Sequence, residues 1–329
     1  MEHVRLGRSG LPVSRLCLGT MTFGLQCDED QSRRILDKAL DGGIDFLDTA
    51  DGYPLGGDLS TVGRTEEILG RYLAGKRQDV VLATKCFVPM GPHPWNAGTS
   101  AKHILDAIDA SLRRLQTDYV DLYQLHFDDR ATPLEETLRA LDQVVRDGKA
   151  RYIGVSNWAA WRLALAVGKA ELLRTVPITS VQPRYNLLFR ANERDLFPLC
   201  HETGVGVIPY NPLAGGLLTG KHARQDEAPD GRFTLGNVGG MYRDRYWHDR
   251  EFDTVDALRP LADEAGVSMA QLALGWVLAQ PAITAPIVGA SRPEQLDDAL
   301  AAASKGLDPE IVSRLDELTV EWRRSDAER

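Results

Sequence analysis

The sequence has few of the features that mark secreted or membrane-spanning proteins. Only four of its 329 residues are cysteines, and none of them forms a Cys-x-x-Cys pair, so neither a disulfide framework nor a zinc ribbon is indicated. No apolar run approaches the ~20 residues that cross a bilayer, and the first residues have no signal-peptide character. We therefore expect a reduced, cytoplasmic protein without a membrane partner.

The sequence also lacks an excess of positive charge. Its 38 Lys and Arg residues are outnumbered by 47 Asp and Glu residues, which leaves a formal net charge of -9. An acidic surface does not attract nucleic acid, so none is expected as a partner. The histidines show no metal-ligand spacing, and we expect no metal site. A hydrophobic content of 43 % is enough for a large core and excludes wholesale disorder.

Short apolar runs alternate with longer amphipathic segments along the chain. Segments with helical periodicity lie between the runs, for example residues 31–41, and Ser100, Pro133 and Ser268 stand where further helices begin. Repeated strand–helix alternation favours a closed (β/α)8 TIM barrel of the α/β class. The apolar runs number eight and have the composition of buried parallel strands: residues 16–19, 46–48, 80–85, 120–126, 152–156, 179–182, 206–210 and 284–289.

The main alternative is a doubly wound open sheet, which usually carries G-x-G-x-x-G after its first strand. The sequence there is GTMTFG, at residues 19–24, so the barrel is preferred. Residues 4–13 predict an N-terminal β-hairpin, and the polar stretch 213–253 predicts a long loop over the barrel mouth, followed by some helix. No linker or internal repeat divides the chain, so residues 1–329 are expected to form a single domain.

Charged and polar residues stand at the predicted strand ends, where (β/α)8 barrels build their active sites. Three consecutive strands end in Asp48, Lys85 and His126, and Tyr53 lies five residues beyond Asp48. Taken singly, Asp48 could be a turn cap and Lys85 a surface side chain. A barrel core has no structural need for all three groups, and buried charges are costly unless paired. The pattern therefore predicts one site.

These four residues have the chemistry of a tuned general acid. The phenol of Tyr53 has an ordinary pKa of about 10, which is too high for easy proton donation at neutral pH. The ammonium of Lys85 is expected to lower that pKa, and Asp48 is expected to keep Lys85 charged and in place. His126 is expected to orient a carbonyl oxygen.

The residues around this site resemble the aldo-keto reductases. The segment GIDFLDTADGY at residues 43–53 is similar to that family's signature around its catalytic Asp and Tyr. Further motifs follow in family order, from about residue 4 to residue 303: TK at 84–85, LH at 125–126, GVSN at 154–157, VQ at 181–182, YNPLAGGLLTGK at 210–221 and GASRPEQL at 289–296.

The resemblance implies a nicotinamide cofactor that lies across the barrel mouth, without a separate dinucleotide-binding domain. It implies catalytic roles for Asp48, Tyr53, Lys85 and His126. It also implies that Ser156, Asn157 and Gln182 hold the nicotinamide carboxamide, with Tyr210 stacked on the nicotinamide ring. The adenosine end of the cofactor is implied to lie among Gly289, Ser291, Arg292, Gln295 and Asp298. The residues that it assigns to the cofactor are Thr20, Met21, Asp48, Ser156, Asn157, Gln182, Tyr210, Asn211, Pro212, Leu213, Ala214, Lys221, Arg232, Gly289, Ser291, Arg292, Gln295 and Asp298.

NADPH (NADP+) is expected in preference to NADH. Ser291 and Arg292 offer hydroxyl and guanidinium donors for a 2′-phosphate just where Pro293 opens a helix. The sequence departs from the family at two positions. Ala299 stands where many members have Asn, and Gly289 stands where another branch has a phosphate-binding Lys, which makes Arg292 the expected replacement.

The predicted function is NADPH-dependent reduction of a small-molecule aldehyde or ketone, sugar-like or aromatic, with Tyr53 as proton donor. The alternative is a cofactor-binding regulatory subunit that resembles channel-associated β subunits. A lyase that uses Lys85 as a Schiff-base amine is disfavoured, because a charged lysine is a poor nucleophile. The sequence does not distinguish a monomer from a homo-oligomer. Expected pocket residues, from loop position, are Met21, Phe23, Trp95, Phe127 and Trp247.

Overall fold

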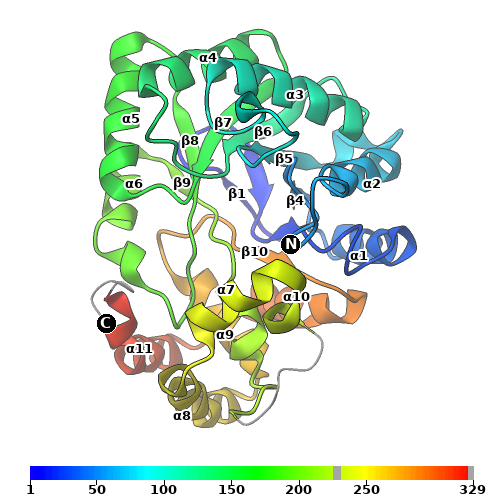
Figure 1. Ribbon diagram of the computed structural model, residues 1–329. Coiled ribbons are helices and arrows are strands. Elements are labelled where there is room, and N and C mark those ends of the chain that lie inside the picture. The colour runs from blue at the N-terminus through cyan, green and yellow to red at the C-terminus, as the bar shows by residue number, and fades with distance from the viewer. Residues whose placement is uncertain (225–230, 325–329) are drawn as a thin grey trace.

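The computed structural model describes residues 1–224 and 231–324, and within them an eight-stranded parallel sheet is surrounded by helices (Figure 1). The strands pair in the order β10-β3-β4-β5-β6-β7-β8-β9. Their bounds are β3 Cys17–Gly19, β4 Phe46–Asp48, β5 Val81–Cys86, β6 Val120–Leu125, β7 Ala150–Ser156, β8 Ile178–Gln182, β9 Gly206–Val207 and β10 Ile287–Gly289.

The sheet closes on itself between β9 and the segment before β10. Val207 forms a parallel bridge with Ile283, and the backbone N–H of Thr284 donates to the carbonyl of Val207 at 2.8 Å. The predicted (β/α)8 barrel is confirmed. The last two strands are shorter than predicted, because Pro209 and Pro286 have no N–H to give to the ladder.

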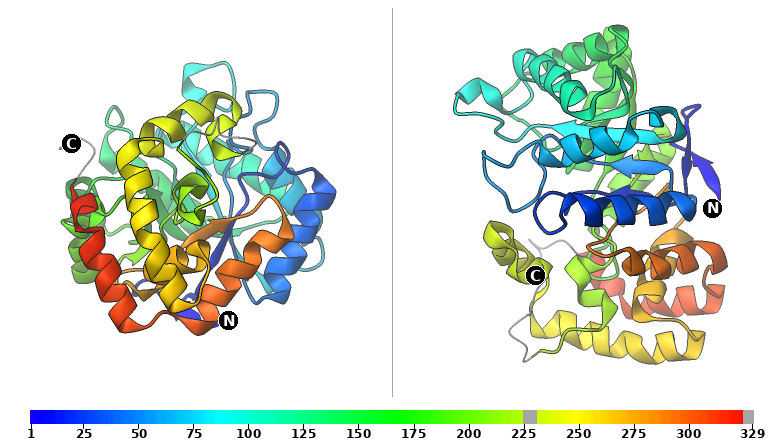
Figure 2. Two further views of the ribbon diagram at one scale, coloured as in Figure 1. Left: turned by 90° about the horizontal axis from the view of Figure 1, so that it is seen from below. Right: turned by 90° about the vertical axis from the view of Figure 1, so that its right-hand side faces the viewer.

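Helices cover the outside of the sheet, as the left view of Figure 2 shows. Ser100 and Ser268 cap two of them as predicted, accepting from the backbone N–H groups of His103 (3.2 Å) and Gln271 (3.0 Å). The helix bounds are α1 Glu29–Asp41, α2 Arg64–Leu73, α3 Ala101–Leu115, α4 Leu134–Arg146, α5 Ala160–Leu173, α6 Leu196–Thr203, α7 Gly236–Tyr246, α8 Asp249–Ala265, α9 Met269–Ala279, α10 Leu296–Lys305 and α11 Pro309–Leu318.

The two ends of the barrel differ. The predicted hairpin is present as β1 His3–Arg5 and β2 Pro12–Ser14, and in the right view of Figure 2 it lies at the opposite end of the strands from α7. The prediction that 213–253 is a loop was wrong for α7, which begins at residue 236, and for the start of α8, which begins at residue 249. This helix is rich in glycine, and its buried Tyr242 and Tyr246 hold it by packing. Residues 225–230 of that stretch lie outside the described residues.

The interior of the barrel changes from apolar to polar along the strands. An apolar cluster that includes Leu6 of the hairpin region and Val13 of β2 fills the end nearest the hairpin. Along a strand, side chains two residues apart point to the same face of the sheet. Along three neighbouring strands these inward positions become polar, because Phe46 is followed by Asp48, Ala83 by Lys85 and Leu122 by Gln124.

A second polar cluster is buried near the C-terminal ends of the strands, around β5, α2 and α3. Glu66 accepts hydrogen bonds from Arg114 Nε (2.7 Å) and Thr84 Oγ1 (2.5 Å). Asp51 is fully buried, and neither of its carboxylate oxygens has a hydrogen-bond partner of good geometry among the described residues. Burial, reinforced by the charge of Glu66, raises the pKa of Asp51 well above its ordinary value. The proton-bearing form of Asp51 is therefore favoured in the folded chain.

We predict that Asp51→Asn stabilises the protein at neutral pH. A raised folded-state pKa means that Asp51 contributes stability below its unfolded pKa of about 3.9, and that this contribution is lost as the pH rises. Asparagine does not ionise, so the variant should melt about 2–4 °C higher than wild type at pH 7. The advantage should shrink as the pH approaches 4. Thermal melting by circular dichroism across this range measures both effects.

The matched control is Asp263→Asn, which changes an exposed carboxylate on α8. Its melting temperature should follow that of wild type at every pH. A wild-type protein that melts above the Asp51 variant at pH 7, or an advantage that does not depend on pH, would contradict the prediction.

Candidate active site

A buried ion pair forms the centre of the candidate site. Asp48 ends β4 and Lys85 lies near the end of β5, and both side chains point into the barrel, almost completely removed from solvent. Lys85 Nζ donates to Asp48 Oδ2 at 2.5 Å and to the carbonyl oxygen of Thr49 at 2.8 Å. These short contacts hold the ammonium in a fixed position.

The phenol of Tyr53 lies against this ion pair. Lys85 Nζ is 3.4 Å from the hydroxyl oxygen of Tyr53 and 4.9 Å from the centre of its ring. The ring of His126 meets that of Tyr53 edge-on, with 5.7 Å between the ring centres. His126 follows β6 directly, and its backbone N–H donates to the carbonyl of Cys86. The structure therefore brings the four predicted residues into one cluster.

Burial is the largest single influence on the pKa values of Lys85, Tyr53 and His126. Burial opposes the charge on Lys85, but the attraction of Asp48 and Tyr53 outweighs it, so the pKa of Lys85 lies above its ordinary value. Burial, followed by the charge of Lys85, lowers the pKa of His126 well below its ordinary value, so His126 is neutral.

The expected lowering of the Tyr53 pKa was wrong in its net direction. Lys85 does act to lower this pKa, but burial of the phenol is the larger effect and the charge of Asp48 adds to it. The pKa of Tyr53 therefore lies above its ordinary value in this structure. The physical reason is the burial of the phenol, which disfavours its charged form, and Asp48 next to Lys85 adds a smaller effect in the same direction.

Gln124 belongs to the same cluster, although we did not predict it. Its Nε2 donates to Asp48 Oδ1 at 3.0 Å, and Nε2 of Gln182 donates to the same oxygen at 3.0 Å. Our prediction considered only the last residue of each strand. The available signal was an uncharged polar residue within an apolar strand, two positions before His126 and therefore on the same face.

The residues assigned to the nicotinamide carboxamide also lie together. Ser156 Oγ donates to the backbone carbonyl of Gln182 (2.8 Å), and Asn157 Nδ2 donates to Ser156 Oγ (3.1 Å). Tyr210 donates its hydroxyl hydrogen to Asn157 Oδ1 (2.8 Å). Nearby, the hydroxyl of Thr20 donates to the backbone carbonyl of Asp48.

The segment after Tyr210 makes a tight turn at the barrel mouth. Asn211 and Ala214 have left-handed backbone angles, with φ of 64° and 50°, and Pro212 is buried while Leu213 is partly buried between them. Asn211 Oδ1 accepts from the backbone N–H of Gly215 at 2.7 Å, which fixes the turn. At another side of the mouth, the backbone carbonyl of Met21 accepts from Leu55.

Two cations come from the segment that begins with this turn. Lys221 is exposed, and Arg232 lies over the ring of Tyr242. Nη1 of Arg232 is buried and has no hydrogen-bond partner among the described residues. A buried guanidinium nitrogen without an acceptor fits an anionic group such as the pyrophosphate of a dinucleotide.

The residues assigned to the adenosine end surround the start of α10. Gly289 is exposed at the end of β10, and Ser291 is held by its backbone N–H, which donates to Gln295 Oε1 at 2.8 Å. Arg292 is exposed just before the 3₁₀ turn Pro293–Gln295. Asp298 accepts hydrogen bonds from the side chains of Ser268 and Gln271 on the α9 side, so it also joins two helices.

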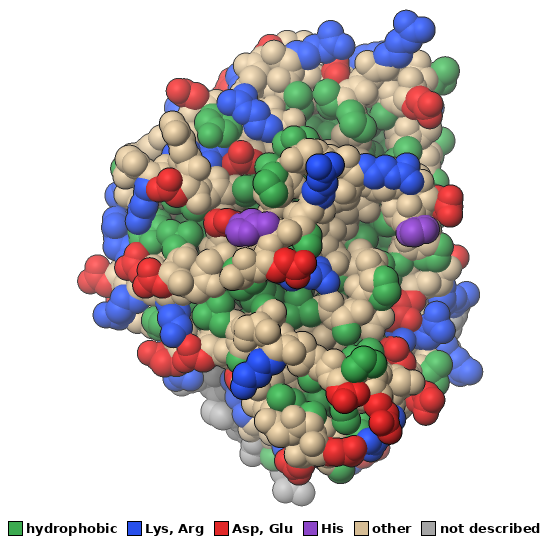
Figure 3. Space-filling model, turned by 180° about the vertical axis from the view of Figure 1, so that it is seen from behind, with side chains coloured by type: hydrophobic (Ala, Val, Ile, Leu, Met, Phe, Trp, Pro, Cys, Tyr) green, Lys and Arg blue, Asp and Glu red, His purple; other side chains and the backbone are tan. Residues whose placement is uncertain are grey.

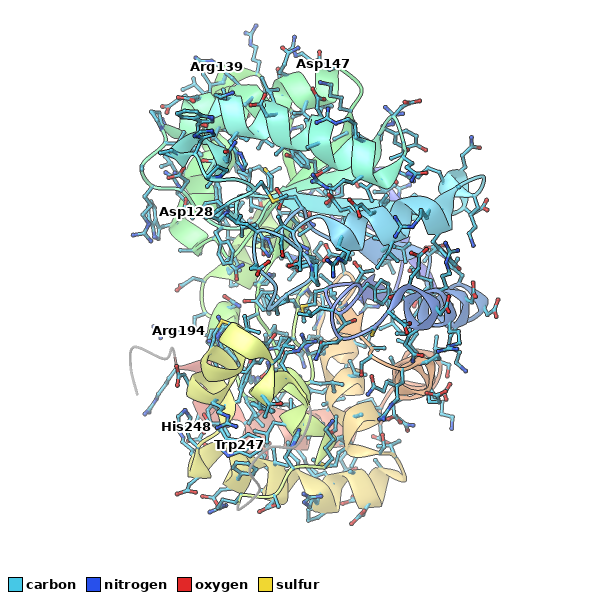
Figure 4. The ribbon with its side chains drawn as sticks, turned by 45° about the vertical axis from the view of Figure 1, so that its right-hand side comes forward. Asp128, Arg139, Asp147, Arg194, Trp247 and His248 are labelled. Carbon is cyan, nitrogen blue, oxygen red and sulfur yellow. The ribbon has the colours of Figure 1, made fainter. Side chains whose placement is uncertain are left out.

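The expected pocket residues divide into two groups. Phe127 and Trp95 are exposed by 41 % and 49 %, and Met21 is partly exposed. Phe23 has no exposed surface, so its assignment to the pocket was wrong. Trp247, labelled in Figure 4 between α7 and α8, packs edge-on against the rings of neighbouring aromatic residues. Aromatic residues in loops thus also anchor the loops to the core.

On the face shown in Figure 3, Lys and Arg side chains are interspersed with Asp and Glu. Among residues 1–224 and 231–324 there is no cluster of three or more potential metal ligands. In the same residues, no helix is long and apolar enough to cross a membrane. Burial raises the pKa of the Cys86 thiol, which keeps it unreactive.

The amino-acid sequence of this chain is similar to those of known proteins. Residues 15–320 match the sequence model of the aldo/keto reductase family. The chain is 41 % identical to the uncharacterized oxidoreductase YrpG of Bacillus subtilis, over 97 % of this chain and 96 % of that protein. It is 39 % identical to a probable voltage-gated potassium channel subunit beta of Arabidopsis thaliana, over 92 % and 91 %.

A third relative is named for a specific reaction. The L-glyceraldehyde 3-phosphate reductase of Escherichia coli K12 is 36 % identical, over 92 % of this chain and 87 % of that enzyme. The family match covers nearly the whole barrel, and each of these relatives is matched over most of its own length. The chain belongs to the aldo/keto reductase family.

Proposed function

We propose that the protein reduces an aldehyde or ketone, sugar-like or aromatic, to the alcohol with NADPH. The observation that carries this proposal is the contact between the Lys85 ammonium, paired with Asp48, and the hydroxyl of Tyr53. A buried phenol next to a fixed cation is suited to give a proton to an oxygen on which negative charge develops. Family membership and a relative named as a reductase support the oxidoreductase class.

The cofactor would supply the hydride, and the chain's own residues would bind it and manage the proton. Ser156, Asn157 and Gln182 would hold the carboxamide, with Tyr210 against the nicotinamide ring. The phosphates would lie near Arg232, whose buried Nη1 has no other acceptor among the described residues.

Proton transfer is assigned to Tyr53. Its hydroxyl would give the proton to the carbonyl oxygen of the substrate, and Lys85 would stabilise the phenolate that remains. His126 is neutral, because burial and Lys85 lower its pKa. It would therefore donate a hydrogen bond to the carbonyl oxygen without itself carrying charge. The raised pKa of Lys85 argues against a Schiff-base mechanism.

A second candidate function is that of a regulatory subunit, which the relative named as a probable potassium channel subunit beta supports. Such a protein would bind the cofactor with little turnover. The two functions are separated by fluorescence titration with NADPH, followed by a panel of aldehydes and ketones while the absorbance of reduced nicotinamide is recorded. Turnover favours the reductase. Tight binding without turnover of any carbonyl favours the regulatory subunit.

We predict that Tyr53→Phe lowers kcat at least 10²-fold, on the order of the contribution of a positioned general acid. The ring remains and only the hydroxyl is lost, so the dissociation constant for NADPH should stay within about threefold of wild type. This corresponds to a change in binding free energy of less than about 1.4 kcal/mol. Steady-state kinetics and fluorescence titration measure the two quantities. Tyr72→Phe, which changes a hydroxyl bonded to Asp37 away from this cluster, is the control. Substantial turnover by the Tyr53 variant would remove it as the proton donor.

We predict that Arg292→Ala weakens NADPH binding about tenfold and leaves NADH binding nearly unchanged. Arg292 is exposed just before the turn Pro293–Gln295, where a guanidinium can pair with a 2′-phosphate that NADH lacks. Titration with both nucleotides measures the ratio of dissociation constants. Arg174→Ala, which changes the exposed residue directly after α5, serves as the charge-matched control. An equal loss of affinity for both nucleotides would refute the assignment.

A further inference from the structure

Gln124 is fully buried inside the barrel, on the strand next to Lys85. The β5–β6 register pairs Lys85 with Gln124, so the two side chains enter the barrel interior side by side. Gln124 Nε2 donates to Asp48 Oδ1 at 3.0 Å, and Gln124 Oε1 accepts from Gln182 Nε2 at 3.3 Å. Gln124 therefore contacts both Asp48 and Gln182.

The two glutamines complete the surroundings of Asp48. One carboxylate oxygen, Oδ2, is bound by Lys85, and the other, Oδ1, accepts one hydrogen bond from Gln124 and one from Gln182. Three donors on one buried carboxylate satisfy both of its oxygens and prevent it from rotating. The position of Lys85 in turn depends on this orientation, because Asp48 Oδ2 is its shortest contact.

A glycine provides the space that Gln124 needs. The β6–β7 register places Gly154 beside Gln124, and Gly154 lies next to Ser180 of β8. A Cβ atom at position 154 would lie 3.2 Å from Gln124 Cγ and 2.4 Å from Ser180 Oγ. Any larger residue would therefore push against the side chain that reaches Asp48. Two independent features, the hydrogen bonds and the absent side chain, favour the same arrangement.

Gln182 connects this arrangement to the cofactor side of the site. Its Nε2 carries two hydrogens, and these are directed to Asp48 Oδ1 and Gln124 Oε1. Its own Oε1 is then the atom that it can offer to the amide of a carboxamide. Asp48 and Gln124 together thus fix which way round the Gln182 amide lies.

We propose that Gln124 is a positioning residue of the reaction, which orients Asp48 and Gln182 together and so joins the carboxamide-binding side to the proton-donating side. The inference rests on the proposed reductase function. The resulting chain of hydrogen bonds runs from Gln182 through Asp48 to Lys85 and Tyr53. Gln124 touches neither substrate nor cofactor and acts through these residues.

The test is Gln124→Leu, which removes the amide and keeps a side chain of similar size. Losing a hydrogen bond to a buried charge should lower kcat about tenfold or more. The dissociation constant for NADPH, measured by fluorescence, should rise by less than about threefold, because Ser156 and Asn157 remain.

A variant of nearly the same shape separates positioning from simple structural support. In Gln124→Glu, a protonated carboxylic acid can still donate to Asp48, whereas an ionised one repels it. The kcat of this variant should therefore recover toward wild type as the pH is lowered, whereas Gln124→Leu should show no recovery. Gly154→Ala should reproduce the loss of kcat by displacing Gln124. Ser180→Ala is the control, because Ser180 Oγ is buried nearby without a hydrogen-bond partner.

The possible failures are distinguishable. If wild type reduces no carbonyl compound, the proposed reductase function fails. If wild type is active and Gln124→Leu keeps its kcat, only the positioning role is overturned. It is also overturned if Gln124→Glu shows no acid recovery, or if kcat, NADPH affinity and melting temperature all fall in parallel. That last pattern would identify Gln124 as a purely structural residue.

Discussion

The structure of the site depends on the ion pair between Asp48 and Lys85 in the barrel interior. Removing two charges from water is costly, and the pair is tolerated because both carboxylate oxygens of Asp48 accept hydrogen bonds. The parallel strands supply these donors from the barrel interior, since β5, β6 and β8 contribute the inward side chains of Lys85, Gln124 and Gln182. The barrel thus gives a fixed, water-excluded position for the ammonium that faces Tyr53.

The same burial that fixes the ion pair also works against the proton donor. Tyr53 has its pKa raised by burial, although Lys85 acts in the opposite direction. His126 responds to the same environment by becoming neutral. The cluster therefore holds a protonated phenol and an uncharged imidazole side by side, which is the protonation state that delivery of a proton to a carbonyl oxygen requires.

The sequence predicted the fold and the four central residues because both depend on local patterns. Apolar runs that end in a polar residue mark barrel strands, and Asp48, Lys85 and His126 stand at such ends. What the sequence did not predict depends on distant contacts. The glycine-rich helix α7 has a low local preference for helix and is held by the packing of its side chains. Phe23 is buried by residues that are distant in the sequence. Gln124 acquires its hydrogen-bond partners only when β4 and β8 take their places in the barrel. The net direction of the Tyr53 pKa depends on burial, which spacing alone does not show.

The central claim is that the Lys85 ammonium is electrically coupled to the hydroxyl of Tyr53. The most direct measurement is the pH titration of the Tyr53 ring by ¹³C NMR in cofactor-free wild type and in Lys85→Met, with Tyr53→Phe used to assign the signal. The account predicts that Tyr53 deprotonates at higher pH in the variant than in wild type. The reason is that the variant lacks the Lys85 ammonium, whose charge opposes the effect of burial on the Tyr53 pKa. An unchanged or lower titration point in the variant would contradict it.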